Sequence, residues 1–471
     1  MGIRLIKRMR ITFLGHQGWR FENGGRSFLL DPILEDIGNG AVGMPVWPRR
    51  RLDFGKLGPL DAVIVSHEHA DHFSLATLAA LPQGCRIYLS DLSSFAMAKA
   101  IAELGFQVTR FAALEPFTIC GLELTALPGL YNTLEPDTYA LLVRDAAGGS
   151  FLTGIDTVAH PDVLAWLARN CPERTLDNLT NNFVEARQAL VDDPAAFAKS
   201  RAAVAGNMLE FVQKFRPRRA VVSGQGWCFQ GAKAKLNHSF FSVDNRWLAA
   251  AARDLAPHVE WLEGAPGLRL TLTGPELAVD RAPEIDVLDS PDRTFDPASV
   301  RGPDPFLPWS GVRSVPADRL RRIRDFIVED FGRILGAHAP NLMQRLYYSK
   351  FQGAGTFGVC VRNASARHLF ELDYGHLTFA EAQASAPDRC AVGLEIWAGD
   401  LELLIAAEED AFAVMESAVR TWTRVPELVD TQALLESFLW FTPRFRPNEF
   451  LRFYRSRIRG LRAQPPQARH A

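Results

Sequence analysis

Residues 65–72, which read VSHEHADH, place three histidines and an aspartate directly after a run of apolar residues. β-Branched side chains in that run favour a buried strand that ends where the polar residues begin. Neutral imidazole and carboxylate groups are ligands for divalent cations such as zinc, iron or manganese. His67 and His69 alternate at extended spacing, so both can reach one metal, and Asp71 and His72 can hold a second metal beside it. The alternative, a solvated polar loop, does not account for so dense a pattern after a strand.

The composition of the chain limits the class of protein. The chain has 471 residues, enough for about two or three domains. Its 47% of hydrophobic and 23% of charged residues are usual in a globular protein. With a formal net charge of -2, we expect no nucleic-acid partner. No apolar run predicts a signal peptide or a membrane span. The 6 cysteines are scattered, without a Cys-x-x-Cys or Cys-x-His pair, which is typical of a cytoplasmic protein.

The order of expected elements divides the chain into three parts. Strands and helices alternate over residues 1–280, with polar residues at the strand ends, which predicts an α/β catalytic domain of stacked layers with a site along one edge. Residues 281–316 are rich in proline and lose this periodicity, so we expect a linker or a wrapping segment. Residues 317–471 begin with an amphipathic helix and continue with further strands and helices. They predict a second, smaller α+β domain.

Three further residues are candidates for the metal site. Asp156 ends an expected strand, where a carboxylate could bridge two metals, although it could also be an ordinary strand-end residue. His238 follows an expected strand and a glycine-rich loop, and binding residues favour loops on a rigid scaffold; the alternative is a surface histidine. His16 lies in a turn flanked by glycines. It could contact the substrate or support a metal ligand, or it could serve the turn alone.

Four motifs together resemble those of the metallo-β-lactamase superfamily in order and in spacing: residues 11–16, 30–32, 67–72 and 154–156. The resemblance extends over about residues 10–280 and implies an αββα sandwich. It also implies a dinuclear metal site at the edge between the two sheets.

A second resemblance extends over most of the chain. Residues 135–139, the expected helix that leads into residues 214–218, the loop 224–227, His238 and residues 441–443 resemble CMP-N-acetylneuraminate hydroxylase. That enzyme family carries an N-terminal Rieske iron–sulfur domain, and this sequence has none of the Cys-x-His pairs of such a domain. The resemblance implies the diiron oxygenase branch of the superfamily, with electrons supplied from outside the chain.

The loop before Asp156 bears on the choice of metal. In the zinc hydrolases that the sequence resembles, a histidine in this loop completes the first metal site, but residues 127–135 contain no histidine. Glu135 is the best donor there. With His67 and His69 it would form a two-histidine, one-carboxylate face, which is typical of non-haem iron that activates oxygen. The alternative is that Glu135 is a loop carboxylate and that this metal site is incomplete.

We therefore predict a non-haem diiron oxygenase that hydroxylates a small organic, carrier-linked or nucleotide-linked substrate. Two Fe ions, O2 and an external electron donor would be needed, and the aromatic C-terminal end could dock a carrier protein. The expected metal ligands are His67, His69, Asp71, His72, Glu135, Asp156 and His238, and the expected catalytic groups are Asp71 and His16.

Two other functions stay open at this point. One is a hydrolase with two Zn or Mn ions that acts on a lactone, an ester or a phosphodiester, in which Asp71 orients the attacking water. The other is a binding protein on a disabled metal fold, which the intact residues 67–72 argue against. These residues support hydrolysis and oxygen activation equally, so the preference for iron rests on Glu135.

Overall fold

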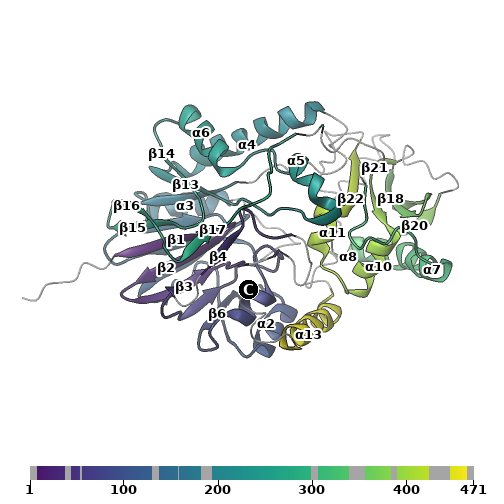
Figure 1. Ribbon diagram of the computed structural model, residues 1–471, viewed down its shortest axis with the longest axis horizontal. Coiled ribbons are helices and arrows are strands. Elements are labelled where there is room, and N and C mark those ends of the chain that lie inside the picture. The colour runs from purple at the N-terminus through teal and green to yellow at the C-terminus, as the bar shows by residue number, and fades with distance from the viewer. Residues whose placement is uncertain are drawn as a thin grey trace, which may run out of the picture.

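Two β-sheets pack face to face in the N-terminal part of the protein, and a third sheet lies at the opposite end (Figure 1). The structure is a computed structural model. It describes residues 8–34, 36–37, 44–52, 56–129, 137–157, 159–181, 194–296, 298, 306–338, 356–382, 390–423 and 446–463. Within these residues, helices cover the outer faces of the first two sheets. The expected αββα sandwich with a smaller α+β unit beyond it is confirmed.

The first sheet has the strand order β16-β15-β1-β2-β3-β5-β6-β7. Its strands are β1 (Met9–Gly15), β2 (Gly18–Asn23), β3 (Arg26–Leu30), β5 (Ala62–Ile64), β6 (Arg86–Ser90), β7 (Gln107–Phe111), β15 (Leu268–Thr273) and β16 (Glu276–Arg281). β3, β5, β6 and β7 run parallel. Their carboxyl ends therefore lie at one edge of the sheet, and the loop after β5 carries residues 67–72 to that edge.

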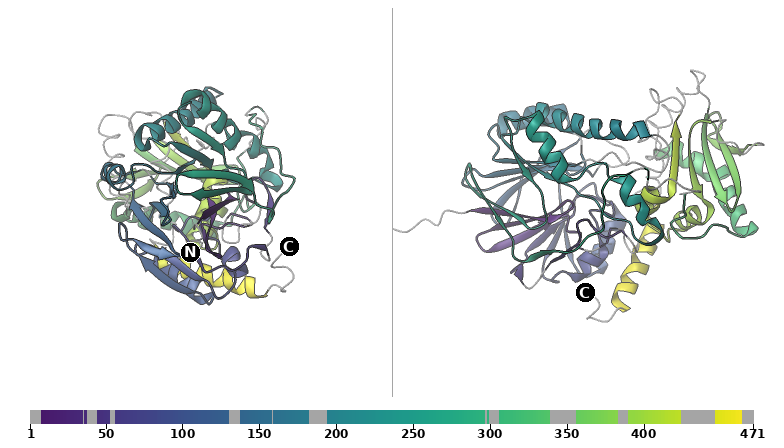
Figure 2. Two further views of the ribbon diagram at one scale, coloured as in Figure 1. Left: turned by 90° about the vertical axis from the view of Figure 1, so that its left-hand side faces the viewer. Right: turned by 45° about the horizontal axis from the view of Figure 1, so that its top comes forward.

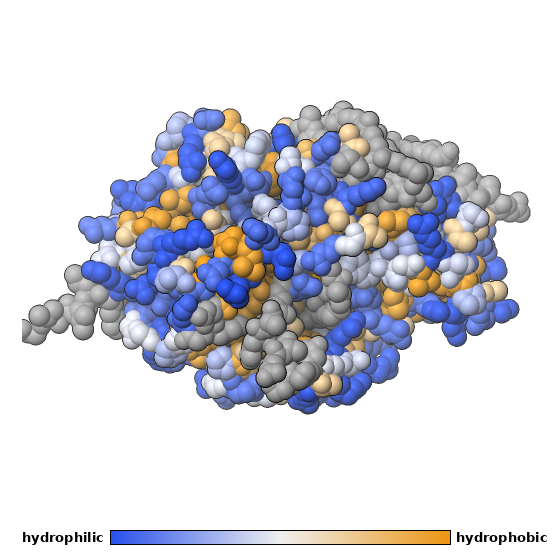
Figure 3. Space-filling view, viewed as in Figure 1, coloured by the Kyte–Doolittle hydropathy of each residue, from blue (hydrophilic) through white to orange (hydrophobic). Residues whose placement is uncertain are grey.

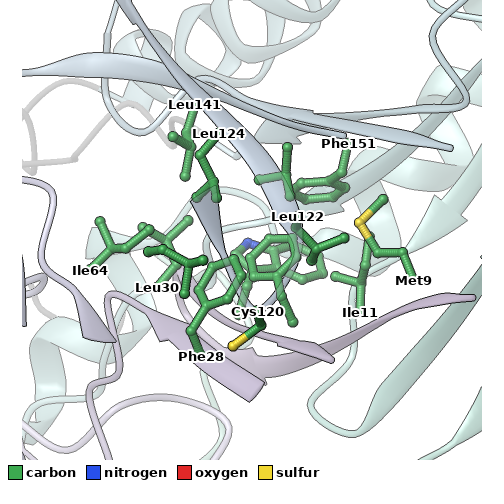
Figure 4. Close-up of a cluster of buried hydrophobic side chains, with 14 of the residues drawn as sticks. Met9, Ile11, Phe28, Leu30, Ile64, Cys120, Leu122, Leu124, Leu141 and Phe151 are labelled. Carbon is green, nitrogen blue, oxygen red and sulfur yellow. The ribbon is translucent and has the colours of Figure 1, made fainter. Parts of the chain in front are cut away.

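The second sheet has the strand order β14-β13-β12-β11-β10-β9-β8. Its strands are β8 (Phe117–Ile119), β9 (Leu122–Pro128), β10 (Tyr139–Arg144), β11 (Ser150–Thr153), β12 (Leu176–Thr180), β13 (Arg219–Ser223) and β14 (Glu260–Glu263). Alternate side chains of a strand point to one face. Met9 and Ile11 of β1 therefore meet Leu122 of β9 and Phe151 of β11 in the core between the sheets (Figure 4).

Helices form the outer layers. α1 (Leu75–Ala80) and α2 (Phe95–Glu103) pack on the first sheet, and α3 (Pro161–Asn170), α4 (Pro194–Phe215) and α6 (Asn245–Leu255) pack on the second. The short η3 (Gly231–Leu236) and α5 (Asn237–Phe240) precede α6. Ser74 and Ser94 begin α1 and α2, because each side chain accepts a hydrogen bond from a backbone N–H in the first turn.

The C-terminal unit is a sheet with the order β20-β19-β18-β21-β22 and helices on one face. Its strands are β18 (Thr356–Asn363), β19 (Ala366–Asp373), β20 (Thr378–Glu381), β21 (Cys390–Trp397) and β22 (Val419–Thr423). Its helices are α7 (Ala317–Asp325), η5 (Phe326–Phe331), α8 (Gly332–His338), α10 (Ala398–Ala406) and α11 (Ala411–Ala418). The helical face that begins at Ala317 supplies Ile323, Ile327 and Phe331 to the core of this unit.

The last helix, α13 (Pro447–Ala463), leaves the C-terminal sheet and packs against α1 and α2 (Figures 1 and 2). Phe450 and Tyr454 belong to the same buried cluster as Phe73 and Met97, and Arg455 forms an ion pair with a glutamate of α2. The division expected from sequence puts this helix in the C-terminal domain. In the structure its apolar face packs on the outer side of α1 and α2, which belong to the first unit, the two-sheet sandwich.

Residues 281–296 wrap across loops of the first unit. β17 (Ile285–Val287) pairs with β4 (Arg50–Leu52) as a separate two-stranded ladder. Trp47 Nε1 donates to the carbonyl oxygen of Pro291 at 3.0 Å. Over its described residues, this segment is therefore tied to the first unit rather than only linking the two units.

The surface shows no long apolar band on the face in Figure 3, where hydrophilic residues predominate and hydrophobic residues form small groups. Among the helices that the structure describes, none is long and apolar enough to cross a membrane.

Lys233 joins the first unit to the C-terminal unit. Its Nζ donates to the carbonyl oxygens of Leu307 and Ser417, at 2.6 and 2.7 Å. Ser417 belongs to α11, so this contact holds that helix against η3 of the first unit. Burial lowers the pKa of Lys233 to about 7, and the nearby Asp400 acts in the opposite direction.

We expect Lys233 to make stability depend on pH. In the unfolded chain the pKa of lysine is about 10.4, whereas in the folded chain the pKa of Lys233 is about 7. Between these values the unfolded state binds the extra proton. The free energy of unfolding from this group therefore rises with pH, by up to about 1.4 kcal/mol per pH unit. Lys233→Met should remove that rise.

The measurement is urea unfolding of both proteins at several values between pH 7 and pH 10. The wild type should gain stability relative to Lys233→Met as the pH increases. Lys235→Met, at an exposed lysine of the same short helix, is the matched control and should follow the wild type. Parallel pH curves for the wild type and Lys233→Met would contradict the prediction.

Candidate metal centre

Ends of both sheets converge on one edge of the sandwich. His16 follows β1, Asp31 follows β3, the loop 67–72 follows β5, and Asp156 follows β11. His16, Asp31 and Asp156 have positive φ values of 52, 44 and 51°. Residues other than glycine rarely adopt this left-handed conformation. Where they do, the residue is often part of a functional site. Each of these residues turns the chain at the edge where the metal motif lies.

The structure brings six predicted site residues together in two groups. His67, His69 and Asp156 form one group, and His16, Asp71 and His72 form the other; within each group the donor atoms lie within 4.8 Å of one another. The groups are neighbours, because the ring centroids of His67 and His72 are 4.2 Å apart. Asp156 Oδ2 lies 2.8 Å from His72 Nε2 and 4.0 Å from His67 Nε2. Asp156 therefore stands between the groups, as a bridging carboxylate would.

Asp31, which the sequence did not single out as a site residue, sets the orientation of two rings. Its carboxylate accepts hydrogen bonds from Ser66 N at 2.7 Å and from Ser66 Oγ at 2.6 Å. Because the Ser66 hydroxyl proton goes to Asp31, Ser66 Oγ accepts from His67 Nδ1, 2.9 Å away. His72 Nδ1 also donates to Asp31, at 2.8 Å. Both rings therefore carry their proton on Nδ1 and turn Nε2 to the site.

Two buried donor atoms show that a cation fits here. His67 Nε2 and Asp71 Oδ1 have no hydrogen-bond partner among the described residues, although both side chains are buried. A buried polar atom without a partner costs about 1–3 kcal/mol, and a metal ion removes that cost. Burial, together with the nearby His72 and His69, holds the pKa of His67 well below its usual value. His67 is therefore neutral, which is the form that binds metal.

The electrostatics of the second group also favour a cation. Burial alone would lower the pKa of His72, but Asp71, Asp156 and Asp31 outweigh it and raise that pKa well above its usual value. Burial alone would raise the pKa of Asp71, but His72 and His16 hold it well below its usual range. The carboxylates thus stabilise positive charge at the point where they meet His72.

His16 supports Asp71 through a defined tautomer. The backbone N–H of Gly226 donates to His16 Nδ1 at 3.1 Å, so Nδ1 carries no proton. In a neutral imidazole the proton is then on Nε2, which donates to Asp71 Oδ2 at 3.0 Å. A metal at Nε2 would require that proton to move. The tautomer therefore favours the expected supporting role of His16 over a role as a ligand.

Two expected ligands remain, and the structure describes only one of them. Glu135 lies outside the described residues. His238 belongs to neither donor group; its Nδ1 lies 3.0 Å from the carbonyl oxygen of Thr294, and its own carbonyl oxygen accepts from Asp296 N. The wrapping segment thus contacts Nδ1 and the backbone of His238, and the role of His238 as a metal ligand stays a prediction. The glycine-rich loop before it reaches the site through Gly226 instead.

A family model described as a β-lactamase superfamily domain matches residues 10–140. This range contains His16, Asp31 and the whole of residues 67–72, and the sandwich has the architecture that the resemblance implied. Residues 10–140 therefore contain a β-lactamase superfamily domain. The match ends before Asp156, so the position of that residue comes from the structure.

Individual proteins are similar to parts of the chain. A UPF0173 metal-dependent hydrolase from Rubrobacter xylanophilus is 32% identical over 94 residues, which are 20% of this chain and 35% of that protein. The structure of Igni18, a metallo hydrolase from Ignicoccus hospitalis, is 14% identical and covers 56% of this chain and 98% of its own, with a TM-score of 0.37. That of CmlA, a diiron β-hydroxylase from Streptomyces venezuelae, is 17% identical and covers 58% of this chain and 55% of its own, also with a TM-score of 0.37.

Proposed function

We propose that the protein is a hydrolase that uses two divalent metal ions on a small ester, lactone or phosphodiester. The observation that carries the proposal is the pair of adjacent donor groups with Asp156 between them. The unpartnered donor atoms His67 Nε2 and Asp71 Oδ1 lie in these groups. The name of the curated relative, a metal-dependent hydrolase, supports the same class of activity.

The donors divide naturally between two cations. His67 and His69 would hold one, Asp71 and His72 would hold the other, and Asp156 would lie between them. Such cations lower the pKa of a bound water and polarise the oxygen of a substrate carbonyl or phosphoryl group.

Neighbouring residues keep the donors in place. Asp31 and Ser66 hold the histidine rings of the motif. His16 holds Asp71 Oδ2, so that Oδ1 stays available to a cation or to a water molecule. The burial of these groups excludes bulk water, which strengthens the electrostatic interactions among them.

We expect His16→Ala to lower the rate of hydrolysis by about 10–100-fold, the usual effect of removing a group that orients a metal ligand. The reason is that Asp71 Oδ2 loses its donor and Asp71 can turn away. His16→Gln should recover part of the rate, because a carboxamide can accept from Gly226 and donate to Asp71. The measurements are kcat and metal content at saturating metal.

The metal content separates the two possible roles of His16. If His16 only supports Asp71, both variants retain as much metal as the wild type. A loss of one metal per chain in His16→Ala, with no recovery in His16→Gln, would show that His16 is a ligand.

One observation favours a second candidate function, a non-haem iron oxygenase. His67, His69 and Asp156 form a two-histidine, one-carboxylate group, a set also used by iron enzymes that activate oxygen. This function would need two Fe ions, O2 and an external electron donor.

The sequence argument for the oxygenase rests on Glu135, so Glu135→His should abolish oxygen uptake. Unchanged uptake in that variant would show that Glu135 is not a ligand.

The two candidates can be tested with metal-free protein. Separate samples are reloaded with zinc, with manganese and, in the absence of air, with iron. A hydrolase should cleave at least one of p-nitrophenyl acetate, γ-butyrolactone and bis(p-nitrophenyl) phosphate. That activity should disappear in His67→Ala and persist in His376→Ala, at an exposed histidine of the C-terminal unit. Oxygen uptake by the reduced iron-loaded protein, without cleavage of any of the three compounds, would overturn the hydrolase proposal in favour of the oxygenase.

A further inference from the structure

The N-terminal end of α11, in the C-terminal unit, contacts the metal loop of the first unit, which is residues 67–72. Ala413 of α11 and Ala70 of the loop belong to one buried cluster. The ring of Phe412 lies beside that of His69, with 6.5 Å between the ring centroids. The side chain of Asp410 accepts a hydrogen bond from Phe412 N at 2.9 Å. Asp410 thereby caps α11, which begins at Ala411, and this contact holds the backbone of Phe412 in the first turn.

Phe412 is backed by a packed aromatic cluster. Its ring centroid lies 5.1 Å from that of Trp227, in an edge-to-face arrangement. Trp227 is buried and contacts Phe240 and Phe241, with centroids 5.6 and 5.4 Å away. Aromatic rings packed in this way hold one another in position. The ring of Phe412 therefore has a rigid aromatic support next to residues 67–72.

Two of the donors reach solvent, and Phe412 lies beside one of them. Most of the donor side chains are buried, but His69 and Asp156 are partly exposed, and Phe412 is partly exposed as well. A molecule that approaches His69 from solvent therefore meets the ring of Phe412 beside it. An aromatic ring at that place offers apolar contact and no hydrogen bond.

We infer that Phe412 forms an apolar wall of the substrate site and selects substrates that carry an apolar group next to the reacting centre. The inference rests on the proposed function for the identity of the site, and it assigns specificity to the C-terminal unit. Apolar contacts of this kind discriminate between substrates by about 10–200-fold. The selected group is an aromatic or branched alkyl substituent on the carbonyl or phosphoryl centre.

The test uses binding to the cobalt-loaded protein, which needs no turnover. Acetate and phenylacetate differ only by an aromatic substituent next to the carboxylate. Each is titrated into the protein loaded with Co(II), and the change in visible absorption gives its Kd. The wild type should bind phenylacetate about tenfold or more tightly than acetate. Phe412→Ala should bring the ratio of the two Kd values close to one while the cobalt content stays unchanged.

Trp309→Ala is the matched control, because Trp309 is also a partly buried aromatic residue packed against the same cluster. It should keep the wild-type ratio. Phe412→Leu should give an intermediate ratio, and it replaces the alanine variant if the latter does not fold. An unchanged ratio in the Phe412 variants, or no preference for phenylacetate in the wild type, would overturn the inference. Kinetics with p-nitrophenyl acetate and p-nitrophenyl phenylacetate test the hydrolase proposal separately, since binding does not depend on hydrolysis.

Discussion

Asp31→Ala is expected to weaken metal binding by about 10–100-fold. The carboxylate of Asp31 accepts from the backbone N–H and the hydroxyl of Ser66 and from His72 Nδ1, and all three residues are buried. Without it, His72 can rotate and Ser66 can no longer hold the ring of His67. Each buried donor left without an acceptor also costs about 1–3 kcal/mol, so the free energy of unfolding should fall as well.

Competition of metal-free protein with a chromophoric chelator measures the affinity, and urea unfolding measures the stability. Asp145→Ala is the matched control. Asp145 is a buried carboxylate that accepts from Ala147 N and Gly149 N, at 2.8 Å each, in the hairpin between β10 and β11. It should lose stability but keep the wild-type metal affinity. A wild-type affinity in Asp31→Ala would mean that Asp31 does not orient the ligands.

Arg293→Met is expected to lower the free energy of unfolding by about 3–5 kcal/mol. Arg293 is buried in the wrapping segment, and its Nη1 donates to the carbonyl oxygens of Gln225 and Trp227, at 2.8 and 2.7 Å. Its guanidinium lies between the rings of Trp47 and Phe241, 3.7 and 3.9 Å from their centroids. Methionine fills a similar volume but removes the hydrogen bonds that Arg293 donates to both carbonyl oxygens.

Burial lowers the pKa of Arg293 to about 9, so the side chain is still charged at neutral pH and its attraction to the two rings persists. Arg293→Lys should recover only part of the stability, because an ammonium group lacks the planar face that stacks between rings. Arg51→Met is the surface control, because Arg51 of β4 also contacts the wrapping segment. Arg51 pairs with Asp286 at an exposed site, so its loss should cost less than about 1 kcal/mol. Equal losses for Arg51→Met and Arg293→Met would contradict the prediction.

The metal loop could be predicted because its signals are local. A run of β-branched residues followed at once by histidines and an aspartate predicts a strand that ends in ligands, and β5 (Ala62–Ile64) leads into residues 67–72 as expected. The place of Asp156 at the end of an expected strand has the same local origin. The alternation of strands and helices likewise predicted the layers of the sandwich.

The supporting contacts could not be predicted in the same way, because they join residues far apart in the chain. Asp31 meets Ser66 and His72 only because β3 and β5 are neighbours in the sheet. A signal was present, since an aspartate ends the third expected strand within a motif that the superfamily resemblance used. The sequence could not show which side chains that aspartate would hold.

The amino-acid order alone was enough to infer a resemblance to the superfamily, the layered fold and a cluster of possible metal ligands at a strand end, since hydrophobic periodicity and ligand spacing act over a few residues. The folded chain was needed to learn that His16 donates to Asp71, that His238 faces the wrapping segment, that α13 packs on the first unit and that Phe412 stands beside His69. These facts depend on which apolar faces and buried polar groups find complementary partners. That choice is made by packing across the whole molecule.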